Sequence, residues 1–336
     1  MSAPQEHRAI QFREHGDPAQ MLSVGTTPTP RPGRGQVRVR MLLSPINPSD
    51  LLVVRGVYGR LPKLPATPGF EGVGIVEQSG GGLLGWRVLG RRVAVINADS
   101  GNWQQQVVIP ARQAIPVPDG VPDEQIACFM VNPATAYIMT AKVLRVPRGE
   151  WLLQTAAGSA LGKMVIKLGK HLGFRTINVV RRQEGVDQLR ALGGDAVVTT
   201  SHEDLVERVQ EITEKKGVRY AIDAVGGDVG SRVVGSLAPG GRMLIYGSLS
   251  FEPIHLDPRF MIFGSKKVEG FWLTDWVRAQ NPLAMLALFR RIGQLLKQGV
   301  LTSDIAATYS MDQIAEAVRH VEQSGRTGKV LLRLNG

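Results

Sequence analysis

The chain has 336 residues, 43% hydrophobic and 21% charged, and its mean hydropathy of -0.03 is typical of a globular protein with one large core or two moderate ones. No apolar run reaches the roughly 18 residues of a membrane span and the start lacks a signal-peptide pattern, so we expect a cytoplasmic protein. The net charge of +11 is spread along the chain without a basic run, which disfavours nucleic acid as a partner and equally suits a phosphorylated cofactor or a phosphate-bearing substrate carrier.

The first part of the chain, residues 1–123, is predicted to be mainly β. Short alternating segments, such as Val37, Val39 and Met41, recur between Pro- and Gly-rich turns. This composition indicates a β-barrel-like domain, which we place at residues 1–124.

Strands and amphipathic helices alternate from about residue 124 onward, as in a series of βαβ units. The helix predicted after Glu203 has Leu205, Val209 and Ile212 on one face, as a helix lying on a sheet requires. Six strands with such connections form a doubly wound parallel sheet, so residues 125–273 are predicted to be a cofactor domain. The predicted strands are 151–156, 176–180, 196–200, 220–223, 242–247 and 267–273.

The remaining residues, 274–336, are too few to fold alone. A predicted helix over 283–296 is followed by short segments that end in the apolar run KVLLRL. We expect this tail to return to the first domain and complete it.

A small-residue turn follows the strand at 151–156 and leads into a helix, the arrangement that presents backbone N–H groups to a diphosphate. Aligned with G-x-G-x-x-G, the turn starts at Ala157 and matches a glycine only at Gly162. A close-packed turn without a ligand therefore remains the alternative reading of this segment alone.

Two arginines, Arg181 and Arg182, end the second strand, where a carboxylate would bind the ribose of an unphosphorylated dinucleotide. A guanidinium group can hold a 2′-phosphate with two charge-assisted hydrogen bonds. We therefore predict NADPH rather than NADH, against the alternative that both arginines are solvated charges.

Seven segments together resemble the medium-chain dehydrogenase/reductase superfamily, and within it the zinc-free quinone oxidoreductase branch. The similarity is greatest to mitochondrial-type 2-enoyl thioester (enoyl-CoA/ACP) reductases. The resemblance implies a GroES-like β-barrel catalytic domain plus a doubly wound Rossmann cofactor domain. The segments are INPSDLLVVRGVYG (46–59), PGFEGVGIV (68–76), NPATAY (132–137), INVVRR (177–182), DAVGG (223–227), YGSL (246–249) and GFWLTDW (270–276).

The chain departs from the zinc-dependent members of that superfamily at the metal ligands. Phe70 stands where their Gly-His-Glu motif has histidine, and Cys128 is the only cysteine, so no Cys-rich zinc site or intrachain disulfide can form. We expect no metal. The enoyl reductases also carry an Asn-Ser pair where this chain has Gly158 and Ser159.

Without a metal, the substrate must accept hydride readily, as a double bond conjugated to a carbonyl or thioester does. The resulting enolate needs hydrogen-bond donors and a proton at the α carbon. The resemblance implies that Tyr58, whose hydroxyl is protonated at neutral pH, is this donor. The alternatives are that Tyr58 orients the thioester oxygen or is a loop aromatic without a catalytic role.

The resemblance also implies the cofactor contacts. Asn47, a plausible turn former before Pro48, is expected at the nicotinamide, and Lys329 is expected to reach in from the returning segment. The sixth strand is expected to pair with its twin in a homodimer. The other expected contacts are Asn132, Thr135, Gly158, Ser159, Ala160, Leu161, Arg181, Arg182, Tyr246, Gly247, Ser248, Leu249, Phe271, Trp272 and Leu273.

The predicted function is NADPH-dependent reduction of a 2-enoyl thioester carried by CoA or an acyl carrier protein. An NADPH quinone or enone reductase on the same scaffold is the first alternative. A cofactor-bound binding protein without catalysis is the second.

Overall fold

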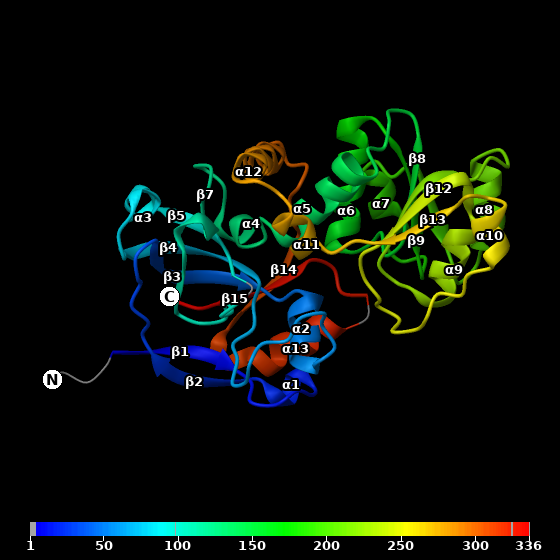
Figure 1. Cartoon of the computed structure of the whole chain (residues 1–336). Coiled ribbons are helices and arrows are strands. Elements are labelled where there is room, and N and C mark those ends of the chain that lie inside the picture. The colour runs from blue at the N-terminus through cyan, green and yellow to red at the C-terminus, as the bar shows by residue number, and fades with distance from the viewer. Residues whose placement is uncertain (1–4, 98, 324, 336) are drawn as a thin grey trace. The chain divides into compact units, whose positions relative to one another are not determined.

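The structure is a computed structural model that describes residues 5–97, 99–323 and 325–335 (Figure 1). It divides into two compact units, residues 1–131 with 303–336, and residues 132–302. The units correspond to the GroES-like and Rossmann-like parts expected from the sequence. No helix in the described part of the chain is both long and apolar enough to cross a bilayer.

Both unit boundaries lie later in the chain than the predicted ones at 124/125 and 273/274. Side-chain contacts explain the second difference. Arg291 Nη2 lies 3.2 Å from His171 Nε2, and Lys167 Nζ donates to Thr302 Oγ1 at 2.9 Å, so the chain up to residue 302 stays with the second unit. The next residue, Ser303, is bound through its backbone N–H and carbonyl by the side chain of Gln125 in the first unit.

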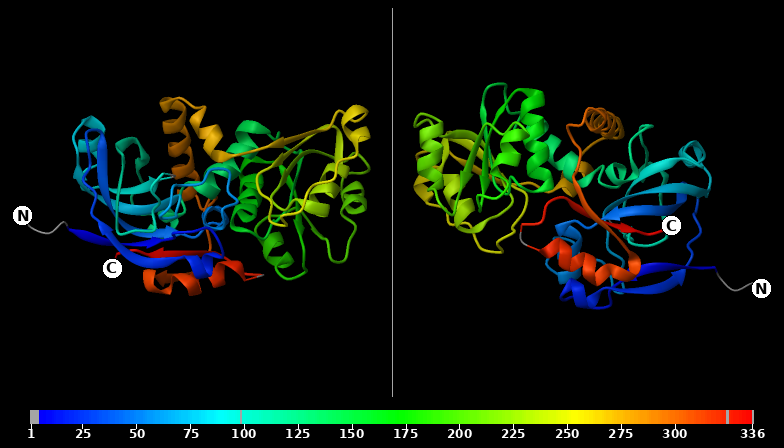
Figure 2. Two further views of the ribbon diagram at one scale, coloured as in Figure 1. Left: turned by 60° about the horizontal axis from the view of Figure 1, so that its bottom comes forward. Right: turned by 180° about the vertical axis from the view of Figure 1, so that it is seen from behind.

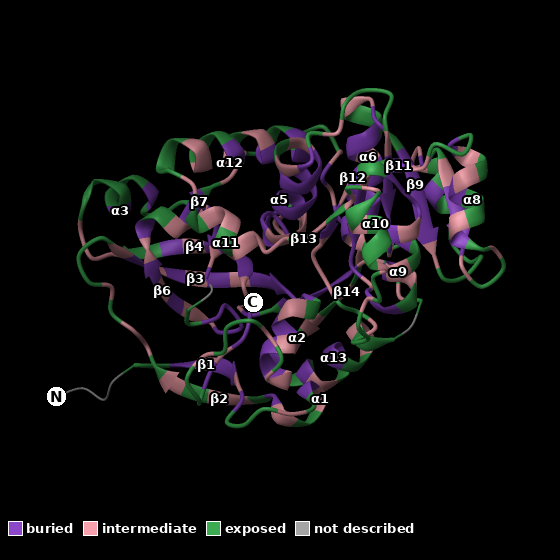
Figure 3. Ribbon diagram, turned by 45° about the vertical axis from the view of Figure 1, so that its right-hand side comes forward, coloured by how far each residue is buried: buried purple, intermediate pink, exposed green. Residues whose placement is uncertain are grey.

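The first unit contains a seven-stranded sheet in the order β14-β15-β3-β4-β5-β7, with β6 also paired to β3. Val37, Val39 and Met41 of β3 are buried in alternation, as the sequence pattern predicts (Figure 3). A separate antiparallel pair, β1 with β2, completes its strands. Their bounds are β1 (Glu6–Gln11), β2 (Ser23–Pro28), β3 (Gln36–Pro45), β4 (Glu71–Ser79), β5 (Arg92–Ile96), β6 (Gln106–Pro110), β7 (Ala114–Pro116), β14 (Ile305–Ser310) and β15 (Lys329–Arg333).

Residues 303–336 belong to the first unit, whereas 274–302, which the prediction also assigned to the returning segment, belong to the second. Strand β15 pairs antiparallel with β3, and helix α13 lies against α1, the red and blue segments seen together in Figure 2. The apolar core of this unit includes Ile10, Trp103 and Leu332. Its helices are α1 (Pro18–Met21), α2 (Pro48–Arg55), α3 (Leu83–Val88), α4 (Asp123–Ala127) and α13 (Ile314–Glu322), with 3-10 turns η1 (Ala111–Gln113) and η3 (Met311–Gln313).

The second unit is built on a six-stranded parallel sheet in the order β10-β9-β8-β11-β12-β13, which confirms the predicted doubly wound sheet. Because crossovers between parallel strands are right-handed, the reversal of strand order between β8 and β11 puts the helices that connect β8, β9 and β10 on one face and the later helices on the other. The strands are β8 (Trp151–Gln154), β9 (Arg175–Val180), β10 (Ala196–Thr199), β11 (Val218–Asp223), β12 (Leu237–Ile245) and β13 (Lys267–Gly270).

The last predicted strand is shorter than expected. It ends at Gly270 rather than residue 273, because Leu273 already begins a helix whose N-cap is Trp272. The helices of this part are α5 (Val131–Tyr137), continued by the π-helical segment η2 (Ile138–Val143), α6 (Ala160–Leu172), α7 (Val186–Ala191), α8 (Leu205–Ile212), α9 (Gly227–Gly235), α10 (Pro258–Ile262), α11 (Leu273–Arg278) and α12 (Pro282–Lys297).

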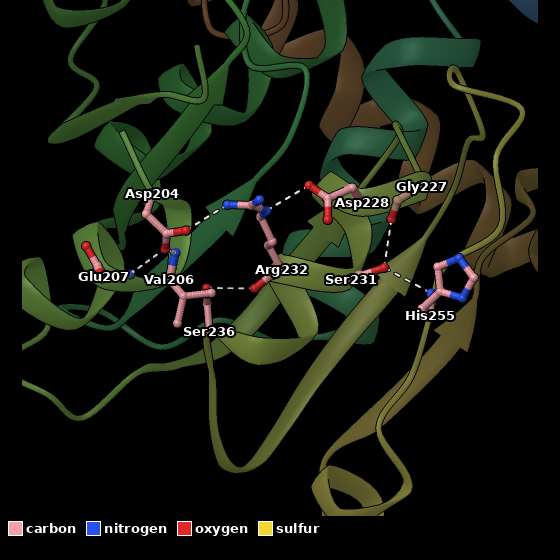
Figure 4. A network of polar contacts seen from close by, with 9 residues as sticks. All are labelled: Asp204, Val206, Glu207, Gly227, Asp228, Ser231, Arg232, Ser236 and His255. Carbon is pink, nitrogen blue, oxygen red and sulfur yellow. Dashed lines mark hydrogen bonds and ion pairs between the residues drawn. The ribbon is translucent and has the colours of Figure 1, made fainter. Parts of the chain in front are cut away.

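A polar network joins helices α8 and α9 (Figure 4). Arg232 of α9 donates to Asp204 and to Asp228, each at 2.7 Å, while Asp204 also caps the start of α8. Ser231 Oγ donates to a backbone carbonyl of its own helix and accepts from the backbone N–H of His255 at 2.9 Å. The bond from His255 ties the loop after β12 to helix α9.

Candidate functional site

The carboxyl ends of β8 and β11 meet where the strand order of the sheet reverses. In open parallel sheets this is the place at which ligands bind. The segments expected to hold the cofactor follow β8, β9, β12 and β13, so the topology brings them to one edge of the sheet.

The small-residue turn after β8 leads directly into α6. Ser159 is the N-cap of this 13-residue helix, and its side chain accepts from the Gly162 N–H at 3.1 Å. Ala160 and Leu161 form the first turn of the helix, where backbone N–H groups and the helix dipole favour an anionic group.

The two glycines of the turn have different surroundings. A Cβ at Gly162 would lie 2.5 Å from the Ala157 carbonyl oxygen and 2.6 Å from Ala157 Cα, so only glycine allows this close packing of α6 on the turn. A Cβ at Gly158 would meet nothing within 4 Å, and Gly158 is exposed. The turn is thus tightly packed on the sheet side and open at Gly158.

Arg181 and Arg182 follow the last residue of β9, and both are exposed. The Arg181 carbonyl accepts from the Ser201 N–H at 3.2 Å, which ties this segment to the one that follows β10. Two guanidinium groups therefore stand at the end of the strand next to β8, as the sequence predicts.

A buried polar group that the sequence analysis missed lies at the ends of β8 and β11. The Asp223 carboxylate accepts from Thr155 Oγ1 at 2.5 Å and from the Val225 and Gly226 N–H groups at 3.1 and 2.9 Å. Both Asp223 and Thr155 are fully buried. In the sequence, the signal for this group was a carboxylate at the end of the apolar strand YAID. These bonds fix the loop between β11 and α9 against the glycine turn.

Tyr246 adjoins this group through its backbone N–H, which donates to the Asp223 carbonyl at 2.9 Å. Its hydroxyl is buried and has no hydrogen-bond partner among the described residues. Burial, with a smaller contribution from Asp223, raises the pKa of Tyr246. An unpartnered buried hydroxyl fits a site that binds a polar ligand.

The remaining predicted cofactor residues of this unit lie on three segments. Gly247, Ser248 and Leu249 follow β12, and the Leu249 N–H donates to the Ala224 carbonyl at 2.9 Å. Phe271, Trp272 and Leu273 follow β13 and are partly buried. The Phe271 N–H donates to the Ile245 carbonyl at 2.7 Å. Asn132, partly exposed, and Thr135, buried, belong to α5.

Taken together, these residues fit a phosphorylated nicotinamide dinucleotide. The open turn at Gly158 and the start of α6 can receive an anionic group such as a diphosphate. The guanidinium groups after β9 can bind a phosphate, and the unpartnered Tyr246 hydroxyl can bind a polar atom of the ligand. Among the described residues, no group of three or more His, Cys, Asp or Glu side chains is arranged to hold a metal ion.

Tyr58, in the first unit, lies three residues beyond the end of α2. Its half-buried ring packs against Phe70, with ring centroids 5.3 Å apart and an interplanar angle of 40°. Gly56, the C-cap of α2, has φ 78°, a left-handed conformation that turns the chain out of the helix toward Tyr58. The tyrosine is thus placed by a helix end and an aromatic neighbour.

Asn47 and Lys329 are bonded to each other in the first unit. Lys329 Nζ donates to Asn47 Oδ1, and Asn47 Nδ2 donates to Glu71 Oε1 at 3.1 Å. Asn47 is 1% and Lys329 3% exposed, so both belong to a buried cluster, and their contact with a cofactor stays a prediction. Asn47 also caps α2, as a residue before Pro48 can.

Two carboxyl groups that the sequence analysis did not assign complete this cluster. Asp50 accepts from the Asn47 N–H at 2.7 Å and from the Phe70 N–H at 3.0 Å. Burial raises the pKa of Asp50 to about 7, although its hydrogen bonds and Lys329 oppose the rise. Burial also raises the pKa of Glu71, which Lys329 again opposes. The spacing of Asn47 and Asp50, a capping-box pattern, was the signal for Asp50.

Comparison with known proteins agrees with the fold. An alcohol dehydrogenase GroES-like domain model matches residues 33–119, and a zinc-binding dehydrogenase model matches residues 160–290. The mitochondrial enoyl-[acyl-carrier-protein] reductase of Rattus norvegicus is 35% identical over 306 residues, covering 90% of this chain and 82% of the relative.

Solved structures give the same result. A candidate NADPH:quinone reductase from Bacillus thuringiensis has a TM-score of 0.93 and 32% identity, covering 98% of this chain and 99% of that one. A complex of Etr1p with NADP and crotonyl-CoA has a TM-score of 0.85 and 25% identity, covering 98% and 100%. This chain therefore belongs to the medium-chain dehydrogenase/reductase superfamily, close to the mitochondrial enoyl-[acyl-carrier-protein] reductases.

Proposed function

We propose that this oxidoreductase uses NADPH to reduce the activated C=C bond of a 2-enoyl thioester, without a metal ion. The observation that carries the proposal is the pair Arg181 and Arg182 at the carboxyl end of β9, beside the strand that leads into the glycine turn. The rat relative named as an enoyl-[acyl-carrier-protein] reductase and the NADP and crotonyl-CoA bound to Etr1p support the substrate class.

Each part of the second unit has a role in this proposal. The guanidinium groups of Arg181 and Arg182 bind the 2′-phosphate, which a carboxylate at this place would repel. The N–H groups at the start of α6 bind the diphosphate, and Gly158 leaves room for its approach. When bound, the cofactor supplies the hydride.

In the first unit, Tyr58 Oη donates a proton to the α carbon of the reduced thioester. A phenolic hydroxyl is a general acid that can give its proton to a carbanion-like carbon. Packing against Phe70 holds its ring in place before the substrate binds. The thioester is carried by CoA or by an acyl carrier protein, whose phosphate groups suit the net charge of +11.

The direct test compares two acceptors under the same conditions. NADPH oxidation is followed with crotonyl-CoA and, separately, with a small quinone. The proposal predicts turnover of the thioester with a higher kcat/KM than the quinone. Quinone turnover without thioester turnover would refute the substrate assignment, and no oxidation across a panel of enones and thioesters would favour a protein without catalysis.

A quinone or enone reductase is the second candidate. The similarity at TM-score 0.93 to a candidate NADPH:quinone reductase favours it. The same cofactor contacts and the same tyrosine would serve this reaction, so the acceptor comparison distinguishes the two.

The proposal includes a homodimer in the cytoplasm. Within the described residues, β13 pairs only with β12, which leaves one edge of this strand available to a second copy of the chain. Light scattering coupled to size-exclusion chromatography tests this, because a monomer at micromolar concentration would contradict it. Cell fractionation tests the compartment.

A further inference from the structure

Four buried polar side chains form a junction in the first unit between segments far apart in the sequence. Asn47 and Asp50 come from the start of α2, Glu71 from the start of β4 and Lys329 from the start of β15. None of them is more than 3% exposed. Burying one ammonium and two carboxyl groups is costly unless they bind one another, so the arrangement calls for an explanation.

Glu71 holds the beginning of helix α5. Its Oε2 accepts from the backbone N–H groups of Met130 and Val131, both at 2.9 Å. These are N–H groups that a helix start leaves without a partner in the helix, and a negative charge there also interacts favourably with the helix dipole. Asn132 and Thr135, the predicted nicotinamide contacts, follow on this same helix.

Glu71 also holds the beginning of helix α2. Its Oε1 accepts from Asn47 Nδ2, and Lys329 donates to the opposite side of the same amide. A cation at Oδ1 and a carboxylate at Nδ2 allow only one orientation of the Asn47 amide. A single carboxylate therefore contacts the start of α2, which leads to Tyr58, and the start of α5, which carries Asn132 and Thr135.

We propose that Glu71, assisted by Lys329, is a positioning residue for the reduction. It fixes the starts of α2 and α5, so that the tyrosine and the nicotinamide-contacting segment are both preorganised. The inference rests on the proposed function, because it assigns Glu71 a role through Tyr58 and through α5. It does not make Glu71 a proton donor or a ligand.

The donors around Glu71 favour its charged form and oppose the rise in its pKa that burial causes. Lys329 is the only ammonium of the junction, and Glu71 receives three N–H donors where Asp50 receives two. Hydrogen bonds from N–H groups stabilise the charged form of a carboxyl. The Cys128 thiol also faces this cluster, but burial raises its pKa to about 12, so it stays neutral at physiological pH.

The test replaces Glu71 by its uncharged isostere. In the wild type, the Glu71 carboxylate accepts hydrogen bonds from N–H donors at the starts of both helices. In Glu71→Gln, the NH2 group of the glutamine must face some of these donors and cannot accept from them, so the starts of α2 and α5 should loosen. A misplacement of about 1 Å can cost about 100-fold in rate, and we expect kcat to fall about 10- to 100-fold. The Kd for NADPH should change less than about threefold, because its phosphate contacts are elsewhere. The isotope effect on kcat with 4-deuterated NADPH should rise.

Two controls make the result specific. Glu77→Gln alters a carboxylate on the same strand that is one-third exposed and bound to Arg40, and it should leave kcat unchanged. Glu71→Gln alone removes a negative charge that interacts with the buried Lys329 ammonium and could unfold the protein. The double variant Glu71→Gln/Lys329→Met removes both charges, so it should fold and still show the reduced kcat.

Two measurements distinguish a failure of the Glu71 inference from a failure of the proposed function. Kinetics are measured with crotonyl-CoA and with a small quinone, and hydrogen exchange is measured on the peptide covering residues 126–135. A folded Glu71→Gln protein with normal kcat and normal exchange protection would overturn the inference, as would a double variant that is unfolded or fully active. If the wild type reduces neither acceptor, the proposed function fails. Hydrogen exchange still tests the role of Glu71 in that case. Faster exchange at 126–135 in Glu71→Gln would support its role in holding the start of α5, and unchanged exchange would contradict it.

Discussion

A methyl group added at Gly162 should open the turn between β8 and α6. Its Cβ would lie 2.5 Å from the Ala157 carbonyl oxygen, whereas ordinary contact begins at 3.4 Å, so the helix and the turn must separate by 0.9 Å. The other close atoms, Ala157 Cα and the Ala156 carbonyl oxygen, are also backbone and cannot rotate away. In this respect the position differs from an ordinary helical glycine.

The magnitude follows from two opposing effects. Overpacking of this kind costs about 1–3 kcal/mol, and a backbone clash belongs at the upper end of that range. Alanine recovers about 1 kcal/mol through its better helix propensity, which leaves a net destabilisation of about 2 kcal/mol. For a domain of this size each kcal/mol lowers Tm by about 2–4 °C, so Gly162→Ala should melt about 4–8 °C below the wild type.

Gly158→Ala is the matched control in the same turn. Because an added Cβ there meets nothing within 4 Å, the protein without cofactor should melt within about 2 °C of the wild type. The same methyl group occupies the space predicted for the diphosphate, so the Kd for NADPH should rise at least about tenfold. Thermal melts with and without NADPH measure both effects. A Gly162→Ala protein as stable as the wild type would show that the turn tolerates a Cβ at this position. A Gly158→Ala protein that binds NADPH normally would show that the diphosphate does not lie at Gly158.

Three further predictions concern Tyr58, Asp50 and the expected independence of the reaction from a metal ion. Tyr58→Phe should lower kcat for crotonyl-CoA about 100-fold or more with little change in the Kd for NADPH, since general acids contribute about 10²–10⁴-fold, and an unchanged rate removes Tyr58 from the mechanism. Because the pKa of Asp50 is raised from 3.8 to about 7, the folded protein binds this proton more tightly than the unfolded chain, so stability relative to Asp50→Asn should decline from about pH 4 to pH 7. Urea unfolding at pH 5 and pH 8 checks this, and an Asp50→Asn protein with the same pH dependence as the wild type contradicts it. Dialysis against a chelator should leave the steady-state rate unchanged, whereas loss of activity restored by zinc would show that a metal is required.

The sheet of the second unit could be predicted because each strand is a short apolar run ended by turn residues. The sequence does not show where the last of these runs stops being a strand. KVEGFWL is compatible with strand throughout, yet the chain enters a helix at Leu273. Short apolar segments do not distinguish the two periods, so the end of such a strand is decided by tertiary packing.

The buried partners of the site could not be predicted in the same way. Glu71 contacts the N–H groups of Met130 and Val131, about sixty positions further along the chain, and Lys329 joins them from the C-terminal segment. A lone glutamate or lysine in a sequence is usually exposed, so neither residue signals burial by itself. The glycine turn and the two arginines were predictable because their chemistry lies in adjacent positions.

The preference of the site for the phosphorylated dinucleotide is measured by isothermal titration of the wild-type protein with NADPH and with NADH. We expect NADPH to bind at least about tenfold more tightly, a difference of about 1.4 kcal/mol, and we expect this preference to disappear when Arg181 and Arg182 are replaced by alanine. Equal or tighter binding of NADH by the wild type would contradict it.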